Sequence, residues 1–233
     1  MKTAIRLIIS AVVVVGLGVT VGPWAYINFI KDDAPAALDI DSTTNTTIDN
    51  DDTVPAPLTD ASGDWQVTPN TDSVVGYRVK EILFGQATEG VGRTKDVEAT
   101  LTIANNAVTA ASFTVQMGTL TSDAAKRDDQ FNGRIMDVAT HPTATFSLTK
   151  PITLPANAVS GDVITTDATG ELTLRGTTKT VTFPVEAQVQ GSTFTVVSNI
   201  TIVFSEWSIP EPSLPGISVD PQGLLEFALV FTR

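Results

Sequence analysis

From residue 64 to the C-terminus, apolar and polar residues alternate with a period of two, as they do along a β-strand that buries one face. The alternation is clearest over residues 75–79, 97–103, 113–117, 181–187 and 225–231. Turn residues separate these stretches, and Asn105-Asn106 has the length and composition of a two-residue hairpin turn. About seven to nine such strands predict an all-β domain whose antiparallel sheet curls into a barrel or packs as a sandwich.

The alternation stops at residues 122–138, where apolar side chains recur at helical spacing instead. Ser122 or Asp123 is suited to cap the first turn, because its side chain can accept a hydrogen bond from a free backbone N–H. Pro142 follows and would end the helix. The apolar residues that would bury one helix face are Phe131, Ile135 and Met136. The pattern predicts one short helix, placed as a lid over the mouth of a barrel.

Residues 204–217 form a second irregular stretch, with three prolines among the six residues 210–215. Proline lacks the N–H that a sheet ladder needs, so this stretch is excluded as an inner strand. Its large apolar side chains belong to Trp207, Ile209, Leu214 and Ile217. We expect them to pack either on the rim of the domain or on a ligand. Pro184 interrupts one alternating stretch and predicts an edge position or a bulge there.

Residues 7–27 contain no charged side chain, and a helix of that length reaches about 31 Å, the apolar thickness of a bilayer. Lys2 and Arg6 precede this run. Residues 1–30 are therefore predicted to be an uncleaved signal-anchor, a transmembrane helix with its short N-terminus in the cytoplasm. The alternative is a cleaved secretory signal, which would leave a secreted protein but usually has a shorter apolar core. Either way, we expect everything after residue 31 to be extracellular or periplasmic.

Residues 31–63 contain eight aspartates and almost no large apolar side chain. Such a segment buries too little surface to offset its ordering entropy, which predicts a disordered acidic linker. The globular domain then covers residues 64–233. A reach of about 30 Å for the flexible linker would let this domain touch the membrane that anchors it.

Composition removes several classes of function. The net charge of −12 argues against a nucleic-acid partner, which needs a basic surface. Without cysteine there are no disulfides, no thiol catalysis and no Cys-based zinc site. His141 is the only histidine, it lies beside Pro142 at a predicted corner, and no Gly-x-Ser-x-Gly motif accompanies it. The sequence therefore predicts a non-enzymatic protein without a metal site or an obligatory cofactor.

Five blocks of the domain resemble the YceI family of exported, lipocalin-like, lipid-binding proteins. They are Asp64-Trp65-Gln66-Val67, residues 73–79, the turn at 89–92, residues 121–146 and residues 170–181. The last block resembles the family pattern G-x-L-T-I-x-G-x-T-x-x-V, and together the blocks span residues 64–233 in order. The chain departs from the family at Asp72-Ser73, where members often carry His-Ser, and at residues 207–212. Because of these departures, the resemblance does not predict the residues that meet the head group, or which lipid is bound.

The resemblance implies a lipocalin-like barrel of about eight antiparallel strands, with one or two short helices, around an apolar tunnel that binds a polyisoprenoid or an isoprenoid quinone. The expected tunnel-lining residues are Val75, Tyr77, Val79, Leu101, Phe113, Val115, Met117, Phe131, Ile135, Met136, Phe146, Leu148, Leu172, Leu174, Phe183, Val185, Trp207 and Phe227. By residue pattern alone, each of them is equally compatible with an ordinary core. The alternative is a β-sandwich with a solid core, which would serve interaction or adhesion at the cell surface.

The predicted helix also carries the cations Lys126 and Arg127, with Arg134 just beyond them. Their simplest interpretation is a solvated helix face, on which acidic neighbours three or four residues away pair with them. The alternative is that one of the three meets a lipid head group at the mouth of the tunnel.

Overall fold

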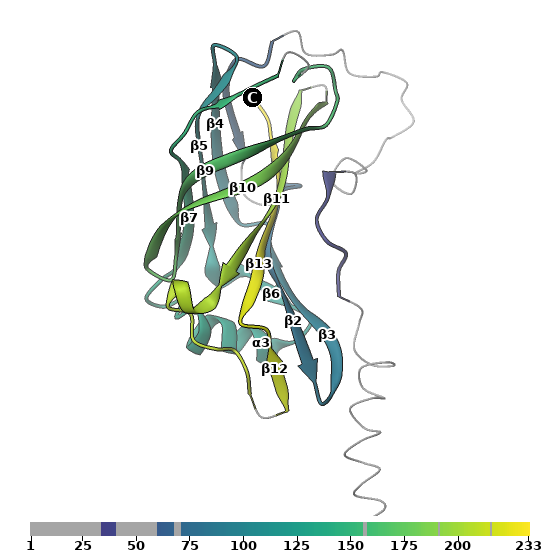
Figure 1. The fold of residues 1–233 in the computed structure, drawn as a ribbon, viewed down its shortest axis with the longest axis vertical. Helices are drawn as coiled ribbons and strands as arrows, with labels where there is room; N and C mark the ends of the chain where they lie inside the picture. Colours follow the sequence, from purple (N-terminus) through teal and green to yellow (C-terminus); the bar gives the residue numbers. More distant parts are fainter. Residues whose placement is uncertain (1–33, 41–59, 68–70, 156–157, 191, 215) are drawn as a thin grey trace, which may run out of the picture.

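The structure, a computed structural model, describes residues 34–40, 60–67, 71–155, 158–190, 192–214 and 216–233 (Figure 1). The predicted membrane span, residues 7–27, lies outside the described residues, and so does most of the predicted linker. Within the described ranges, no helix is both long enough and apolar enough to cross a bilayer.

One antiparallel sheet of thirteen strands makes up the domain within the described residues, and it curls into a half-barrel (Figure 1). Its strands are β1 (Gly63–Val67), β2 (Val74–Leu83), β3 (Gln86–Thr94), β4 (Val97–Ala104), β5 (Ala107–Gln116), β6 (Thr121–Ser122), β7 (Thr143–Leu148), β8 (Ile152–Thr153), β9 (Ile164–Leu174), β10 (Thr177–Gln190), β11 (Thr193–Val203), β12 (Ile217–Val219) and β13 (Gln222–Phe231). The order across the sheet is β1-β4-β5-β7-β9-β10-β11-β13-β2-β3-β6, while β12 pairs with β2 and β8 with β5.

The all-β antiparallel prediction is confirmed, although the sheet has more than the expected eight or so strands. Three of the extra strands are only two or three residues long, too short to show alternation: β6, β8 and β12. The long strands bury alternate residues as predicted. In β13, Leu225, Phe227, Leu229 and Phe231 are all buried on the concave face.

Two predicted backbone features of the sheet are present. Asn105 and Asn106 join β4 to β5 with φ of 52° and 58°, the left-handed values that a two-residue type I′ hairpin requires. Pro184 lies in the half of β10 that pairs with β9 alone, because pairing between β10 and β11 begins only at Val185. Pro184 therefore has no partner strand on its β11 side, as at an edge position.

The predicted helix exists, but it is shorter than residues 122–138 and begins later. It consists of α3 (Ala125–Gln130) followed by a π-helical turn, η2 (Phe131–Ile135). Neither predicted cap is used, since the N-cap is Ala124 without a side-chain cap bond. The Ser122 hydroxyl instead donates to Asp128 Oδ1 at 2.6 Å, and Ser122 itself belongs to β6. A left-handed residue, Asp137 with φ of 48°, follows η2 well before Pro142.

Residues 34–40 lie on the convex face of the sheet, beside β2 and β3 (Figure 1). Arg78 and Arg93 donate hydrogen bonds to the carbonyls of Pro35 and Ala36, respectively. Ile40 is 5% exposed and packs with Val197 and Ala228. The linker prediction is therefore wrong for these seven residues, because Leu38 and Ile40 supply apolar surface that the compositional average concealed. We call residues 34–40 the strap.

Candidate functional site

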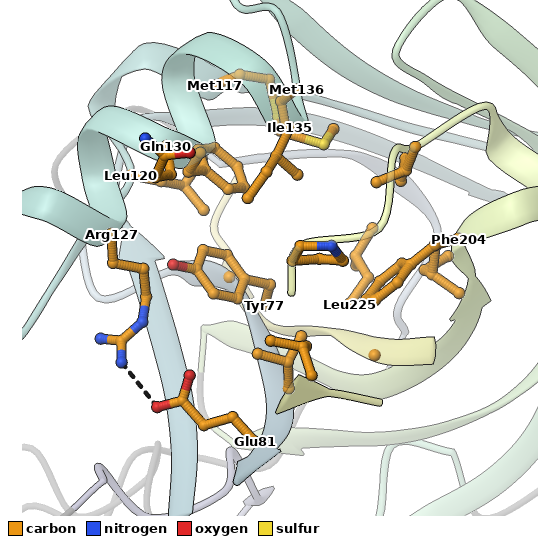
Figure 2. Close-up of a pocket in the computed structure, with 18 of the residues that line it drawn as sticks. Tyr77, Glu81, Met117, Leu120, Arg127, Gln130, Ile135, Met136, Phe204 and Leu225 are labelled. Carbon is orange, nitrogen blue, oxygen red and sulfur yellow. Dashed lines mark hydrogen bonds and ion pairs between the residues drawn. The ribbon is translucent and has the colours of Figure 1, made fainter. Parts of the chain in front are cut away.

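The concave face of the sheet encloses a cavity of about 500 Å³ at the end covered by α3. Its lining is mostly apolar and comes from β2, β5, β13, the α3–η2 segment and the loop after β11 (Figure 2). Nine of the predicted tunnel residues line it: Val75, Tyr77, Val79, Val115, Met117, Phe131, Ile135, Met136 and Leu174. We call this space the mouth cavity.

The α3–η2 segment forms one wall by turning Phe131, Ile135 and Met136 into the cavity, as the helical spacing predicted. The ring of Phe131 stacks on that of Tyr77, with centroids 5.0 Å apart and planes 14° apart. Gly92 on β3 makes room for this arrangement, because a Cβ there would lie 2.3 Å from Tyr77 Cε1. The small residue on β3 therefore fixes where the Tyr77 ring sits.

The proline-rich loop forms the opposite wall. Phe204 and Ile209 are buried, and both line the cavity together with Leu214. Arg134 ties this loop to η2 by donating to the carbonyl oxygens of Glu211 at 2.8 Å and Pro212 at 3.1 Å. The loop is therefore fixed to the domain and also presents apolar side chains to the cavity, so both expected uses stay open. Arg134 holds the loop and does not line the cavity.

The rim of the mouth cavity carries an ion-pair cluster. Arg127 donates to Glu81 Oε1 at 2.9 Å and also pairs with Asp123 (Figure 2). Burial alone would lower the pKa of Arg127, but attraction to Glu81 and Asp123 outweighs it and raises the pKa above its usual value. Arg127 is thus fixed as a cation whose charge two carboxylates already balance.

Tyr77 is a neutral polar group that lines the mouth cavity. Burial raises the pKa of its phenol to about 12, an effect that the nearby charge of Arg127 only partly opposes. The phenol therefore stays protonated at every physiological pH. It offers the cavity a neutral hydroxyl, and Gln130 adds a neutral amide from α3 (Figure 2).

Four phenylalanines form a layer at the inner end of the mouth cavity, and they line the second, smaller cavity beyond it. We call this layer the aromatic floor. Phe113, Phe146 and Phe227 each lie one inward position beyond a residue that lines the cavity on the same strand. Phe183 completes the layer, and neighbouring ring centroids are 5.4 to 6.2 Å apart in stacked, tilted and edge-on pairs. Such contacts favour a tightly packed layer. Beyond it remains a second cavity of only about 80 Å³.

Seven predicted tunnel residues line this second, smaller cavity rather than the mouth cavity: Leu101, Phe113, Phe146, Leu148, Phe183, Val185 and Phe227. Leu172 and Trp207 line neither of the two cavities. Leu172 is fully buried opposite Phe146 in the β7–β9 pairing, and Trp207 is 3% exposed with Lys179 over its ring. The predicted tunnel residues are therefore divided between two cavities on either side of the aromatic layer.

Several lining residues of the mouth cavity were not predicted: Glu81, Leu120, Gln130, Ile202, Phe204, Ile209, Leu214, Ile217, Val219 and Leu225. Four of them, Leu120, Phe204, Ile209 and Leu214, lie outside the named strands and α3, where no period shows which side chains point inward. Glu81 was accessible to sequence reasoning, since it continues the inward series Val75, Tyr77 and Val79. A carboxylate at an inward position marks a place where the interior meets polar partners.

Other candidate chemistry is sparse. Among the described residues, no group of three or more His, Asp or Glu side chains is placed to hold a metal ion. His141 is half-buried, and its ring lies against the β9–β10 turn, where a Cβ on Gly176 would be 2.7 Å from its Cε1. That position agrees with packing at a corner.

The sequence model of the YceI-like domain matches residues 65–231. Among solved structures, the chain is similar to a polyisoprenoid binding domain from Saccharophagus degradans implicated in plant cell wall breakdown, with TM-score 0.58, 14% identity, and coverage of 73% of this chain and 98% of that one. It is also similar to BcnA of Burkholderia cenocepacia, with TM-score 0.54, 24% identity, and coverage of 67% and 95%. At these identities, the likeness shows a shared fold. A search among curated proteins finds no match.

Proposed function

Because the chain belongs to the YceI-like family, we propose that it is a non-enzymatic lipid-binding protein that holds an isoprenoid chain in the mouth cavity of a lipocalin-like half-barrel. The observation that carries the proposal is the mouth cavity itself, about 500 Å³ of mostly apolar space open at one end of the sheet. The similar domain from Saccharophagus degradans, described as polyisoprenoid binding, supports the choice of ligand class. The protein would serve as a carrier, a store or a scavenger of such lipids.

The size of the cavity sets how much of the ligand is bound. A volume of 500 Å³ lies within the range of about 300–1,000 Å³ that is usual for small-molecule sites. At about 0.8 kcal/mol per buried carbon, one five-carbon isoprene unit contributes roughly 4 kcal/mol before the entropy cost of binding. A few units therefore suffice for binding without any polar contact. Because the aromatic floor closes the cavity, a longer chain would extend out of the mouth.

The rim favours an uncharged head group. Arg127 is the half-buried cation of the mouth cavity, and Glu81 and Asp123 already balance its charge. The other lining cation, Lys126, is exposed, and the acidic Asp129 lines the cavity as well. A prenyl phosphate would have to compete with both carboxylates for this guanidinium. A hydroxyl or a quinone carbonyl, by contrast, can use neutral groups such as Tyr77 and Gln130. We therefore infer that the ligand is a polyprenol or an isoprenoid quinone rather than a prenyl phosphate.

The proposal includes a membrane-tethered, extracytoplasmic location. It is supported by the uncharged run of residues 7–27, its preceding Lys2 and Arg6, and the similarity to an exported family. Membrane proximity suits a protein whose ligand partitions into bilayers.

The proposal is tested by purifying the full chain from a bacterial host, extracting it with organic solvent and analysing the extract by mass spectrometry. We expect a near-stoichiometric prenyl lipid with an uncharged head. The emptied protein should then bind added farnesol more tightly than farnesyl diphosphate. An empty extract together with no uptake of added isoprenoid would contradict the proposal and favour an interaction domain instead.

A further inference from the structure

Three exposed apolar side chains lie at the mouth end of the half-barrel, and one of them, Leu214, lines the mouth cavity. Ile82, Phe84 and Leu214 are 50%, 58% and 42% exposed, and they are three of the four large apolar side chains exposed among the described residues. The fourth, Val163, lies at the opposite end of the half-barrel, next to Ile164 of the second cavity. Exposed apolar surface is thus concentrated at the mouth, where it marks an interaction site.

The three residues belong to two tips that contact each other. Phe84 lies at the tip of the β2–β3 hairpin, and its backbone N–H donates to the carbonyl of Gly216 at 2.8 Å. Its ring covers that turn, since a Cβ on Gly216 would lie 2.5 Å from Phe84 Cε1. Leu214 and Ile217 flank the turn and both line the mouth cavity. Phe84 is therefore next to a turn whose apolar neighbours line the cavity.

The conformation of Phe84 indicates a role beyond the fold. Phe84 and Gly85 form a two-residue turn in which both φ angles are positive, 48° and 87°. Asparagine or glycine suits such positions, as at Asn105-Asn106, whereas a bulky side chain is strained there. The Phe84 side chain is also more than half exposed, so burial within the protein does not repay that strain. Strain at a binding surface is offset when the side chain gains a partner.

The direction of the strap identifies the partner as a bilayer. Pro35 accepts from Arg78, which stands opposite Leu224, and Ile40 packs on Ala228, four residues farther from the mouth along β13. The strap thus begins nearer the mouth and runs away from it. The chain before residue 34 leads to the uncharged run of residues 7–27, which is long enough to span a membrane. The six residues between them reach at most about 20 Å.

We propose that Ile82, Phe84 and Leu214 form a membrane-docking rim that seats the mouth cavity on the surface of a lipid bilayer, so that a lipid exchanges between bilayer and cavity. The inference rests on the proposed lipid-binding function for its purpose, but the docking itself is separately measurable. Because Ile82, Phe84 and Leu214 are apolar, docking through them should persist in high salt, unlike the binding of a basic patch to anionic lipid.

The absence of cysteine from the chain permits a single-label test. The full chain carrying Gln86→Cys beside the rim, or Val163→Cys at the far end, is labelled with a fluorophore and reconstituted into phosphatidylcholine vesicles that contain a quenching brominated lipid. We expect several-fold stronger quenching at position 86 than at position 163, and no loss of it in high salt. Equal quenching at the two positions, or quenching at neither, would overturn the proposal.

Phe84→Asn separates docking from folding, because asparagine suits the left-handed conformation and should leave the melting temperature equal or higher. We expect it to reduce quenching at position 86 and to slow isoprenoid transfer to acceptor vesicles, while the amount of extractable lipid stays the same. Val163→Asn is the matched control and should change neither. If Phe84→Asn changed neither the quenching nor the transfer rate, the docking proposal would be overturned. If the unsubstituted protein contained no extractable lipid, the proposed lipid-binding function would be overturned instead.

Discussion

The two halves of the concave interior are built from the same alternating strands, yet one is hollow and the other nearly full. Val115 on β5 and Met117 just after it line about 500 Å³ of space. Phe113, one inward position before Val115, belongs to the layer that leaves only about 80 Å³ beyond it. The difference lies in side-chain size and in the covering elements. Aromatic rings from opposite strands meet across the far half, while the α3–η2 segment and the loop after β11 hold the mouth half open.

The largest expected effect comes from emptying the far half. Phe227→Ala removes a ring that contacts both Phe113 and Phe183, and should lower the free energy of unfolding by about 3–5 kcal/mol. Met136→Ala in the mouth half enlarges a space that is already open, and should lower the free energy of unfolding by clearly less than Phe227→Ala does. Denaturant unfolding of the two variants measures this, and equal losses would show that the halves do not differ in packing.

A charge in the mouth half should remove function without unfolding the protein. Met117→Lys places an ammonium group in the mouth cavity, and we expect isoprenoid uptake to fall by about a hundredfold or more, since burying an unpaired charge costs several kcal/mol. Gln116→Lys, the adjacent and outward-facing position, is the control and should bind normally. Uptake of tritiated polyprenol reports the result, with circular dichroism to verify folding. Normal uptake by Met117→Lys would place the ligand elsewhere.

Within the interior of the half-barrel, deprotonation at high pH should lower stability through the mouth half, because no titratable side chain lines the second cavity. The pKa of Tyr77 is about 12 in the folded protein, above the usual value of 10. A raised pKa stabilises the fold below pH 10, and this contribution is lost as the pH rises from 10 to 12, up to about 2 kcal/mol. In Tyr77→Phe this portion of the alkaline loss should be absent. The free energy of unfolding is measured between pH 9 and pH 12 for the parent protein and for Tyr77→Phe. Equal losses of stability in the two proteins would contradict the burial of Tyr77.

The smallest expected effect concerns head-group choice at the rim. Glu81→Gln removes one of the two carboxylates that balance Arg127, and should improve binding of farnesyl diphosphate by about fivefold, roughly 1 kcal/mol, with little change for farnesol. Competition between the two ligands measures this shift. If Glu81→Gln changes the affinities for farnesol and farnesyl diphosphate by the same factor, the ion-pair cluster does not select the head group.

The sequence predicted the parts of this molecule that depend on period. Alternation identified the sheet and the inward series on β2 and β5, and helical spacing identified the face of Phe131, Ile135 and Met136 that lines the cavity. Alternation says which way a side chain points but not whether facing side chains meet. For that reason Phe146 and Val115 were assigned to one tunnel, although they lie in different cavities.

The first residue of α3 and the cavity wall formed by the loop after β11 could not be predicted from local sequence, because both depend on contacts between distant residues. Ser122 is a good cap in isolation, but pairing between β6 and β3 uses it as a strand residue, and its hydroxyl bonds Asp128 instead. Phe204 and Ile209 lie in an aperiodic segment that Arg134 fixes through backbone carbonyls. These contacts join residues far apart in the chain and leave no local pattern.

The central claim is that the isoprenoid occupies the mouth cavity and stops at the aromatic floor. The most direct test is photolabelling of the full chain with a diazirine-bearing isoprenoid, followed by mass spectrometry of the labelled peptides. We predict labels on Met117, Met136 and the loop at residues 204–214, and none on Leu101 or Leu229 in the far half. Labels on Leu101 or Leu229 would contradict the account, because the ligand would then pass through the floor.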